Sequence, residues 1–505
     1  MNKSRRTKPK VRKGVNMKRI FSLFLALLLL ASCAVSTDPE EPAQNSDGQS
    51  DASAETAEPE TDDYPPCPVP DVTFDGKEFR VLYRQSGYAY DVDDAFSEGL
   101  TGEVVNDAVY NRNLTVETKY GVKLAPLAEV SPAETAAQDF MSGSQGYDCM
   151  TDCMISTFPY ALKGYFYDVN TLTCLNPSDP WWDPNISRDL SVAGHLYIIA
   201  GDIITRPKCD ARFIYFSKGV MDEYGIAYPY DLVKEGTWTI DRMAEMVSTV
   251  STDLDGDGKI TADDRVGLLK ESAPNVLTGC GVTFTEPDEE GLPAVSCINE
   301  RTIAAMEAVH ALFDIPNCTL SYDESAKGRD MSGYPHMWQY VRAVFFATNH
   351  FLFVQNGADE APTFRDMEPG YGVIPNPKLD EEQQNYYHLV DEWSCAWFLP
   401  AAPVDVEFTD QIFTAWAYHS RDVKEAYYEK TLKHKRLNAP VDAEMLDLIF
   451  TSLRYEISLI CDLGVGQVIN TAYSSGNLAS TYAKNEKVIN KKRQKMFADI
   501  LGTGN

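Results

Sequence analysis

The chain has 505 residues, more than one hydrophobic core normally supports, so we expect two or more domains with ample core. Hydrophobic residues make up 44% and aromatic residues 11% of the sequence, which is typical of a globular protein. The 75 acidic and 45 basic residues give a formal net charge of −30. Such a surface repels nucleic acid and phosphate-rich membrane faces, so nucleic acid is not an expected partner.

The first 32 residues predict an export signal. Residues 1–20 carry nine Lys or Arg and no acid, and the mostly apolar run 21–30 is too short to span a bilayer but suits a signal-peptide core. The sequence Leu-Ala-Ser-Cys that ends at Cys33 resembles the lipobox of bacterial lipoproteins. The resemblance implies cleavage before Cys33 and lipid attachment to its thiol. An ordinary signal peptide with an incidental cysteine is the alternative, and Met17 is an alternative start to Met1.

Residues 33–70 predict an extended acidic tether. From Asp38 to Asp63 the chain holds ten acidic residues and no basic residue, with mostly small and polar residues between them. Such a composition cannot bury a core. Apart from Cys33 there are ten cysteines at scattered spacings, and Cys149 and Cys153 are four apart and not a CxxC pair. The spacings leave the disulfide state open.

The folded part begins with alternating strand and helix patterns. A strand is predicted over 77–83 and a helix over 102–120, which Gly121 ends. Further along we predict a strand over 122–124, a helix over 132–141, a strand over 146–150, a β-hairpin over 283–296 and a helix over 442–455. The alternation predicts an α/β fold, with mostly parallel sheets flanked by helices.

An acidic loop follows a helix that Thr239 can cap. Carboxylates stand at loop positions 1, 3, 5 and 12, Gly at position 6 allows a sharp turn, and the residue at position 7 offers its carbonyl. Calcium is bound by oxygen ligands at this spacing, so we expect a calcium site. Its predicted ligands are Asp253, Asp255, Asp257, Lys259 and Asp264. Asp in place of Glu at position 12 favours a structural ion over a switch, and a solvated acidic loop is the alternative.

Several short motifs follow one another in a fixed order: VNDAVYNRN at 105–113, GYD at 146–148, PWWD at 180–183, GHLY at 194–197, AGD at 200–202, FIYFSK at 213–218, YDLVKEGTWT at 230–239 and YGVIPNPK at 371–378. In this order they resemble those of extracellular solute-binding proteins of ABC importers, and more specifically the lipidated, sugar-type family 1. The resemblance covers about residues 74 to 463. Ser217 replaces the family's usual Asn.

The resemblance implies a two-lobed periplasmic-binding-protein-like fold of type II, with a hinge between the lobes. It places residues 71–205 and 343–415 in the first lobe. The second lobe would hold residues 206–342, with the calcium loop, and 416–505.

In open α/β sheets ligands bind beyond the carboxyl ends of the strands, and sugars need an aromatic ring beside planar polar groups. Residues at predicted strand ends and hinge crossings meet these needs. The candidate ligand-binding residues are Tyr83, Arg84, Asp152, Trp182, Asp202, Arg206, His350, Phe351 and Trp393. At least one of Trp181 and Trp182 is expected in the core, because adjacent side chains point opposite ways in extended chain. Arg206 has the alternative of pairing with a carboxylate of its own lobe.

No nucleophile motif, phosphate-binding glycine loop or zinc spacing occurs in the sequence. The absence of these motifs favours a non-enzymatic protein, and the resemblance implies a lipoprotein on the extracellular face of the bacterial membrane, which we expect to be a monomer. By the same resemblance it would capture a mono- or oligosaccharide by lobe closure and deliver it to the transmembrane subunits of an ABC permease. The alternatives are a peptide-binding importer component, a carbohydrate-active enzyme, and a cell-surface scaffold that docks through the calcium loop.

Overall fold

The computed structural model describes residues 64–84, 94–144, 146–401, 405–437, 439–498 and 500. The predicted signal, Cys33 and the tether up to residue 63 lie outside the described residues. From Tyr64 the chain belongs to the compact body: Val69 is buried, and the Tyr64 ring packs 5.7 Å from that of Trp181. The tether predicted to reach residue 70 therefore ends earlier. No helix within the described ranges is long and apolar enough to cross a membrane.

The first lobe is organised by a four-stranded sheet in the order β13-β3-β1-β2. Its strands are β1 (Lys77–Arg84), β2 (Val122–Glu129), β3 (Cys149–Cys153) and β13 (Cys395–Phe398). The pairs β1–β2 and β1–β3 are parallel, as predicted, and β13 is antiparallel to β3. β3 begins later than predicted because Asp148, just before it, accepts hydrogen bonds from the backbone and guanidinium of Arg80.

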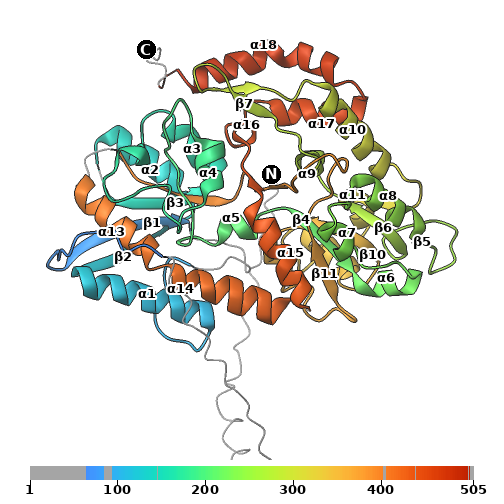
Figure 1. Ribbon diagram of the computed structural model, residues 1–505, viewed down its shortest axis with the longest axis horizontal. Coiled ribbons are helices and arrows are strands. Elements are labelled where there is room, and N and C mark those ends of the chain that lie inside the picture. Colours follow the sequence, from blue (N-terminus) through green and yellow to red (C-terminus); the bar gives the residue numbers. More distant parts are fainter. Residues whose placement is uncertain are drawn as a thin grey trace, which may run out of the picture. The chain divides into compact units, whose positions relative to one another are not determined.

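Helices from both ends of the chain cover this sheet (Figure 1). α1 ends at Gly121, whose φ of 59° is left-handed, as the sequence predicts. The helices of this lobe are α1 (Val104–Tyr120), α2 (Pro132–Ser142), α3 (Met154–Ala161), η1 (Val169–Thr171), α4 (Pro184–Leu190), α5 (Arg206–Cys209), α13 (Val406–Tyr418), α14 (Arg421–Lys424) and the π-helix η4 (Glu425–Arg436).

The second lobe is organised by a sheet in which β4 (Phe213–Ser217) is antiparallel to both of its neighbours. The order is β11-β4-β10-β6-β5, and β9 also pairs with β6. The remaining strands are β5 (Ser251–Thr252), β6 (Arg265–Lys270), β9 (Thr319–Ser321), β10 (Phe351–Asn356) and β11 (Tyr371–Ile374). Because β6, β9 and β10 are mutually parallel, their carboxyl ends share one edge.

The lobe boundaries differ from those expected. β10 and β11 lie within the range 343–415 that was assigned to the first lobe, yet they pair in the second sheet. The apolar run Phe351–Val354 is buried throughout, and a central position between β4 and β6 provides that burial. The chain returns to the first lobe only near β13. In the opposite sense, α14 and η4 pack on α1 although residues from 416 were assigned to the second lobe.

The helices of the second lobe include α8 (Ile240–Thr249), which Thr239 caps by accepting the backbone N–H of Arg242, as predicted. The predicted hairpin forms from β7 (Thr285–Pro287) and β8 (Pro293–Val295). α15 ends before the predicted residue 455 because β14 (Leu453–Arg454) pairs with β12 (His388–Leu389). The others are α6 (Lys218–Tyr224), α7 (Tyr230–Lys234), α9 (Ala273–Gly279), α10 (Glu300–Phe313), α11 (Tyr322–Ala326), α12 (Met337–Val341), the π-helix η2 (Arg342–Phe346), η3 (Ala358–Glu360), α15 (Pro440–Thr451), α16 (Ile457–Ile460), α17 (Val465–Ser475) and α18 (Leu478–Met496).

Candidate functional site

Two crossing segments join the lobes at the edge where the parallel strands end. Residues 206–212 and 388–394 run side by side: the Arg212 N–H donates to the Leu389 carbonyl over 2.9 Å, and the Asp391 N–H donates to the Asp210 carbonyl. β1 and β3 end beside one segment, and β10 ends beside Arg212. Ligands of open α/β sheets bind at such an edge. We name the polar side chains gathered there the interlobe cluster: Arg84, Asp152, Arg206, Asp210, Arg212, Asn356, Asp391 and Trp393.

The second-lobe side of the interlobe cluster is built around Arg212. Its guanidinium donates to the Asp391 carboxylate and to the Asn356 side-chain carbonyl. Asn356 in turn donates to Glu360 over 2.6 Å, and Glu360 pairs with Arg342 at 3.1 Å. Burial opposes charge on Asp391, but the neighbouring Arg212 outweighs it and holds the pKa of Asp391 below its usual range. The arrangement fixes these planar groups rigidly, as paired hydrogen bonding to hydroxyls requires.

The first-lobe side is built around Asp152, which is 1% exposed. One of its oxygens accepts from the Arg84 guanidinium over 2.7 Å, and the other accepts from the Ala133 backbone N–H over 3.0 Å. The Arg84 side chain is 31% exposed. Asp152, predicted as a ligand carboxylate, is therefore placed to orient Arg84, and Arg84 is the group that a solute can reach.

Arg206 pairs with Asp210, one helical turn further along, at 3.0 Å. This contact agrees with the alternative prediction that Arg206 pairs with a nearby carboxylate. Burial raises the pKa of Asp210, and the nearby carboxylate of Asp359 adds to the rise. Arg206 opposes the rise but does not cancel it. Two further buried polar atoms, the Ser394 hydroxyl and one oxygen of Asp359, have no hydrogen-bond partner within the described ranges. Buried polar groups normally have partners, so these two can serve water or a bound solute.

Trp393 supplies an exposed aromatic ring at this edge. It is 58% exposed, and its backbone N–H donates to Asp391 over 2.9 Å, which ties the ring to the interlobe cluster. It lies in the turn before β13. Trp338 is half-buried and stacks on His336, with the Arg342 guanidinium 4.5 Å from its ring. The exposed Trp393 ring is the one that offers an apolar face of the kind that sugars stack on.

The other predicted ligand residues lie away from the interlobe cluster. Tyr83 packs 5.4 Å from Phe96, and Trp182 is 4% exposed and stacks on Phe413. Asp202 is 5% exposed and binds Tyr64 and Lys424. His350 and Phe351 lie at the amino end of β10, which is the edge opposite to the cluster. The sequence analysis missed four members of the cluster, because only the pairing of the crossing segments brings them together: Asp210, Arg212, Asn356 and Asp391.

The predicted calcium loop brings together the carboxylates of Asp253, Asp255 and Asp257, whose ligand atoms lie within 4.8 Å of one another. Asp264 is not in that group. It is fully buried, and its oxygens accept the backbone N–H groups of Leu254 and Thr261 over 2.8 and 2.7 Å, which closes the loop. The three exposed carboxylates are ligands of the type that an oxygen-seeking cation takes. Asp264, predicted as a fourth carboxylate ligand, instead uses its oxygens to close the loop.

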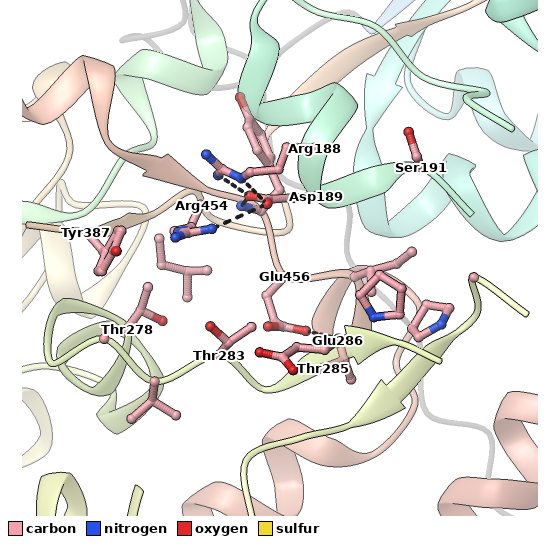
Figure 2. A pocket seen from close by; sticks show the side chains of 18 residues that line it. Arg188, Asp189, Ser191, Thr278, Thr283, Thr285, Glu286, Tyr387, Arg454 and Glu456 are labelled. Carbon is pink, nitrogen blue, oxygen red and sulfur yellow. Dashed lines mark hydrogen bonds and ion pairs between the residues drawn. The ribbon is translucent and has the colours of Figure 1, made fainter. Parts of the chain in front are cut away.

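A cavity of about 330 Å³ lies between α4, α9, the β7–β8 hairpin and β14, and Figure 2 shows its lining. It shares no residue with the interlobe cluster. Four of its charged groups have partners: Arg188 donates to Asp189 and to the Leu453 carbonyl, Arg454 lies 3.7 Å from Asp189, and Glu456 accepts from Thr285 over 2.7 Å. α4 belongs to the first lobe and the other elements to the second, so the cavity also lies between the lobes and is a second candidate solute site.

No family model matches the chain, and no curated protein matches it by sequence. Its fold is similar to those of solved solute-binding proteins. One is a cyclo/maltodextrin-binding protein complexed with maltotetraose, at 14% identity and a TM-score of 0.52, covering 85% of this chain and 98% of that one. Another is an ABC substrate-binding protein from Listeria monocytogenes in complex with cycloalternan, at 11% identity and a TM-score of 0.51, covering 85% and 100%. The chain thus has the two-lobed periplasmic-binding-protein fold.

Proposed function

We propose that the protein is the substrate-binding component of an ABC importer. It captures a carbohydrate, a mono- or oligosaccharide, at the interlobe cluster and does not transform it. The observation that carries the proposal is the position of Arg84, Arg212, Asp391 and the exposed Trp393 ring at the carboxyl ends of strands from both lobes. The two similar structures were solved with oligosaccharides bound, which supports this class of solute.

Lobe closure about the crossing segments would bring the two halves of the interlobe cluster onto the solute. Fixed guanidinium and carboxylate groups then pair with hydroxyls, while Trp393 covers an apolar sugar face. The closed form is presented to the transmembrane subunits of a permease. Lipid attachment at Cys33 would hold the monomer on the extracellular face of the membrane.

The test is thermal unfolding and calorimetry of the full chain with maltotetraose, a panel of monosaccharides and short peptides. A solute at a hundred times its Kd stabilises the folded state by about 2.7 kcal/mol. In a chain of this size that raises Tm by about 3 °C. A shift with carbohydrates and no product formed is expected. A shift with peptides alone would replace the solute class, and no shift with any of them would overturn the proposal.

A matched pair of variants locates the site. Trp393→Ala is expected to weaken carbohydrate binding about tenfold, because a stacked ring contributes about 1 kcal/mol beyond the area it buries. Tyr228→Ala removes a ring that is 36% exposed on the second lobe, away from the interlobe cluster, and should leave the affinity unchanged. Equal affinity in both variants would place the solute elsewhere.

We further propose that calcium binds at Asp253, Asp255 and Asp257, with the Lys259 carbonyl as a fourth ligand, and braces the second lobe. The convergence of the three carboxylates supports this site. Removal of calcium with a chelator should lower Tm without changing which solute binds. The alternative of a docking scaffold predicts instead that the loop captures a partner protein in a calcium-dependent way.

A further inference from the structure

Two cysteines face each other at the edge that carries the interlobe cluster. Cys153 is the last residue of β3 and Cys395 is the first residue of β13. The two are direct partners in the antiparallel pairing, and their sulfurs lie 4.0 Å apart. Within the described ranges no other two cysteine sulfurs lie in such contact.

The backbone geometry at this pair suits a covalent bond. The neighbouring residues Met154 and Ser394 share a backbone hydrogen bond of 2.8 Å, so by the alternation of an antiparallel ladder Cys153 and Cys395 form a non-hydrogen-bonded pair. Cα atoms of such pairs lie about 4.5 Å apart, within the range of about 4.4 to 6.8 Å found for disulfides. Rotation of the side chains is therefore enough to bring the sulfurs into bonding distance, and the strands need not move apart or together.

The two thiols differ in accessibility. Cys153 is 5% exposed, whereas Cys395 is half-buried and open to a small reagent. The contact with the Cys153 thiol, together with burial, raises the pKa of Cys395, and Arg206 opposes that rise. Cys395 is thus mostly a thiol near neutral pH, so its reaction with an oxidant should be slow there and faster in alkali.

We propose that Cys153 and Cys395 are a site of reversible oxidation, at which a small-molecule disulfide converts the two thiols into a cross-strand disulfide. The Cys395 thiolate attacks the reagent, one sulfur of which leaves as a thiolate, and a mixed disulfide forms on Cys395. The Cys153 thiolate then attacks the Cys395 sulfur and releases the second reagent thiolate. The two cysteines lose two electrons to the reagent, which leaves as two thiols carrying the two protons.

The bond would tie β13, the strand that follows a crossing segment, to the end of β3. Its backbone neighbours are Asp152 on one strand and Ser394 on the other, so oxidation would fix the first-lobe side of the interlobe cluster. The two cysteines are 242 positions apart in sequence, and a crosslink that closes so long a loop restricts the unfolded chain strongly. We expect Tm to rise by roughly 5 °C on oxidation.

The experiment treats the folded full chain with oxidised glutathione, blocks remaining thiols and maps the peptides by mass spectrometry. The expected product is one peptide pair linked through Cys153 and Cys395, with the loss of two hydrogen atoms. Its rate of formation should rise about tenfold per pH unit between pH 7 and 8.5, and a reducing agent should reverse it. Cys395→Ser should abolish the linked pair, whereas Cys174→Ser, at a buried thiol elsewhere in the first lobe, should not.

Recovery of both cysteines blocked separately after oxidation, or linkage of Cys395 to another cysteine, would overturn the proposal. A linked pair that forms only after the protein is unfolded would overturn it as well. Peptide mapping of the unsubstituted chain decides the question even where a variant does not fold. The outcome does not depend on which solute the protein binds.

Discussion

His388 makes the stability of the crossing segment sensitive to acid. Its side chain is fully buried on β12; Nε2 accepts the Asn376 backbone N–H over 3.2 Å, and Nδ1 lies 2.9 Å from the Ser452 hydroxyl. A proton on Nε2 would face the Asn376 N–H, so the site accepts only neutral imidazole. Burial accordingly lowers the pKa of His388 to about 3, against about 6.5 in an unfolded chain.

The sign and size of the effect follow from linkage. Because the folded-state pKa is depressed, protonation below about pH 6.5 favours the unfolded chain. The stabilisation is complete above that value and is lost as the pH falls toward 3. Between pH 7 and pH 5 the loss is about 2 kcal/mol, from about 1.4 kcal/mol per pH unit over the interval below 6.5.

The assay is urea unfolding of the full chain at pH 7 and at pH 5, with His388→Gln as the variant. Gln cannot titrate. The free energy of unfolding should therefore fall less between pH 7 and pH 5 in the variant than in the unsubstituted protein, by about 2 kcal/mol. His310→Gln, at a side chain 56% exposed, is the control and should change nothing. If His388→Gln loses as much stability in acid as the unsubstituted protein, the buried neutral imidazole is not the cause.

Three further predictions concern stability. Asp391→Ala should lower the free energy of unfolding by about 3 kcal/mol, since it leaves the Arg212 guanidinium without its carboxylate. Replacing both partners by apolar residues should restore part of the lost stability. An effect of Asp391→Ala below about 0.5 kcal/mol in urea unfolding would refute this. Trp238→Ala should cost about 3 to 5 kcal/mol by the same measurement, because the ring is fully buried and donates to the Pro375 carbonyl over 2.9 Å; a cost near zero would mean that the core refills the space. Asp264→Ala should remove the stabilisation by calcium in a thermal scan, because the buried Asp264 side chain closes the loop even though it is not among the converging carboxylates. A calcium response equal to that of the unsubstituted protein would show that calcium binding does not need Asp264.

Local signals predicted the regular elements well. The helix stop at Gly121, the Thr239 cap and the 283–296 hairpin each depend on a few adjacent residues, and all three occur. The lobe boundaries were harder to predict, because the sequence of Phe351–Val354 indicates a buried strand but not the sheet to which it belongs. Which sheet buries it depends on pairing with β4 and β6, far away in sequence. Periodicity does not encode that choice.

The candidate site was predictable only in part. Arg84, Asp152 and Trp393 lie near strand ends in the sequence and Arg206 at a predicted hinge crossing, and the structure gathers them at one edge. Arg212 sits between a short helix and a strand, and nothing in its neighbours shows that Asp391 will pair with it. Asp202 belongs to the AGD motif of the resembled family, yet it accepts a hydrogen bond from the Tyr64 hydroxyl. Tyr64 lies in the range predicted as a tether, so nothing in the sequence indicated this contact.

In each sheet the strand that the chain enters directly from a crossing segment is antiparallel to its neighbours: β4 follows 206–212, and β13 follows 388–394. An antiparallel strand begins where its parallel neighbours end, so the proposed lobe rotation about the crossing segments would have its axis close to the interlobe cluster. Groups near an axis travel short arcs, and groups at the far edge of each sheet travel long ones. Such a rotation would therefore change contacts within the cluster only by small amounts, and distance labels placed at the far edges of the two sheets should report lobe closure with the greatest change.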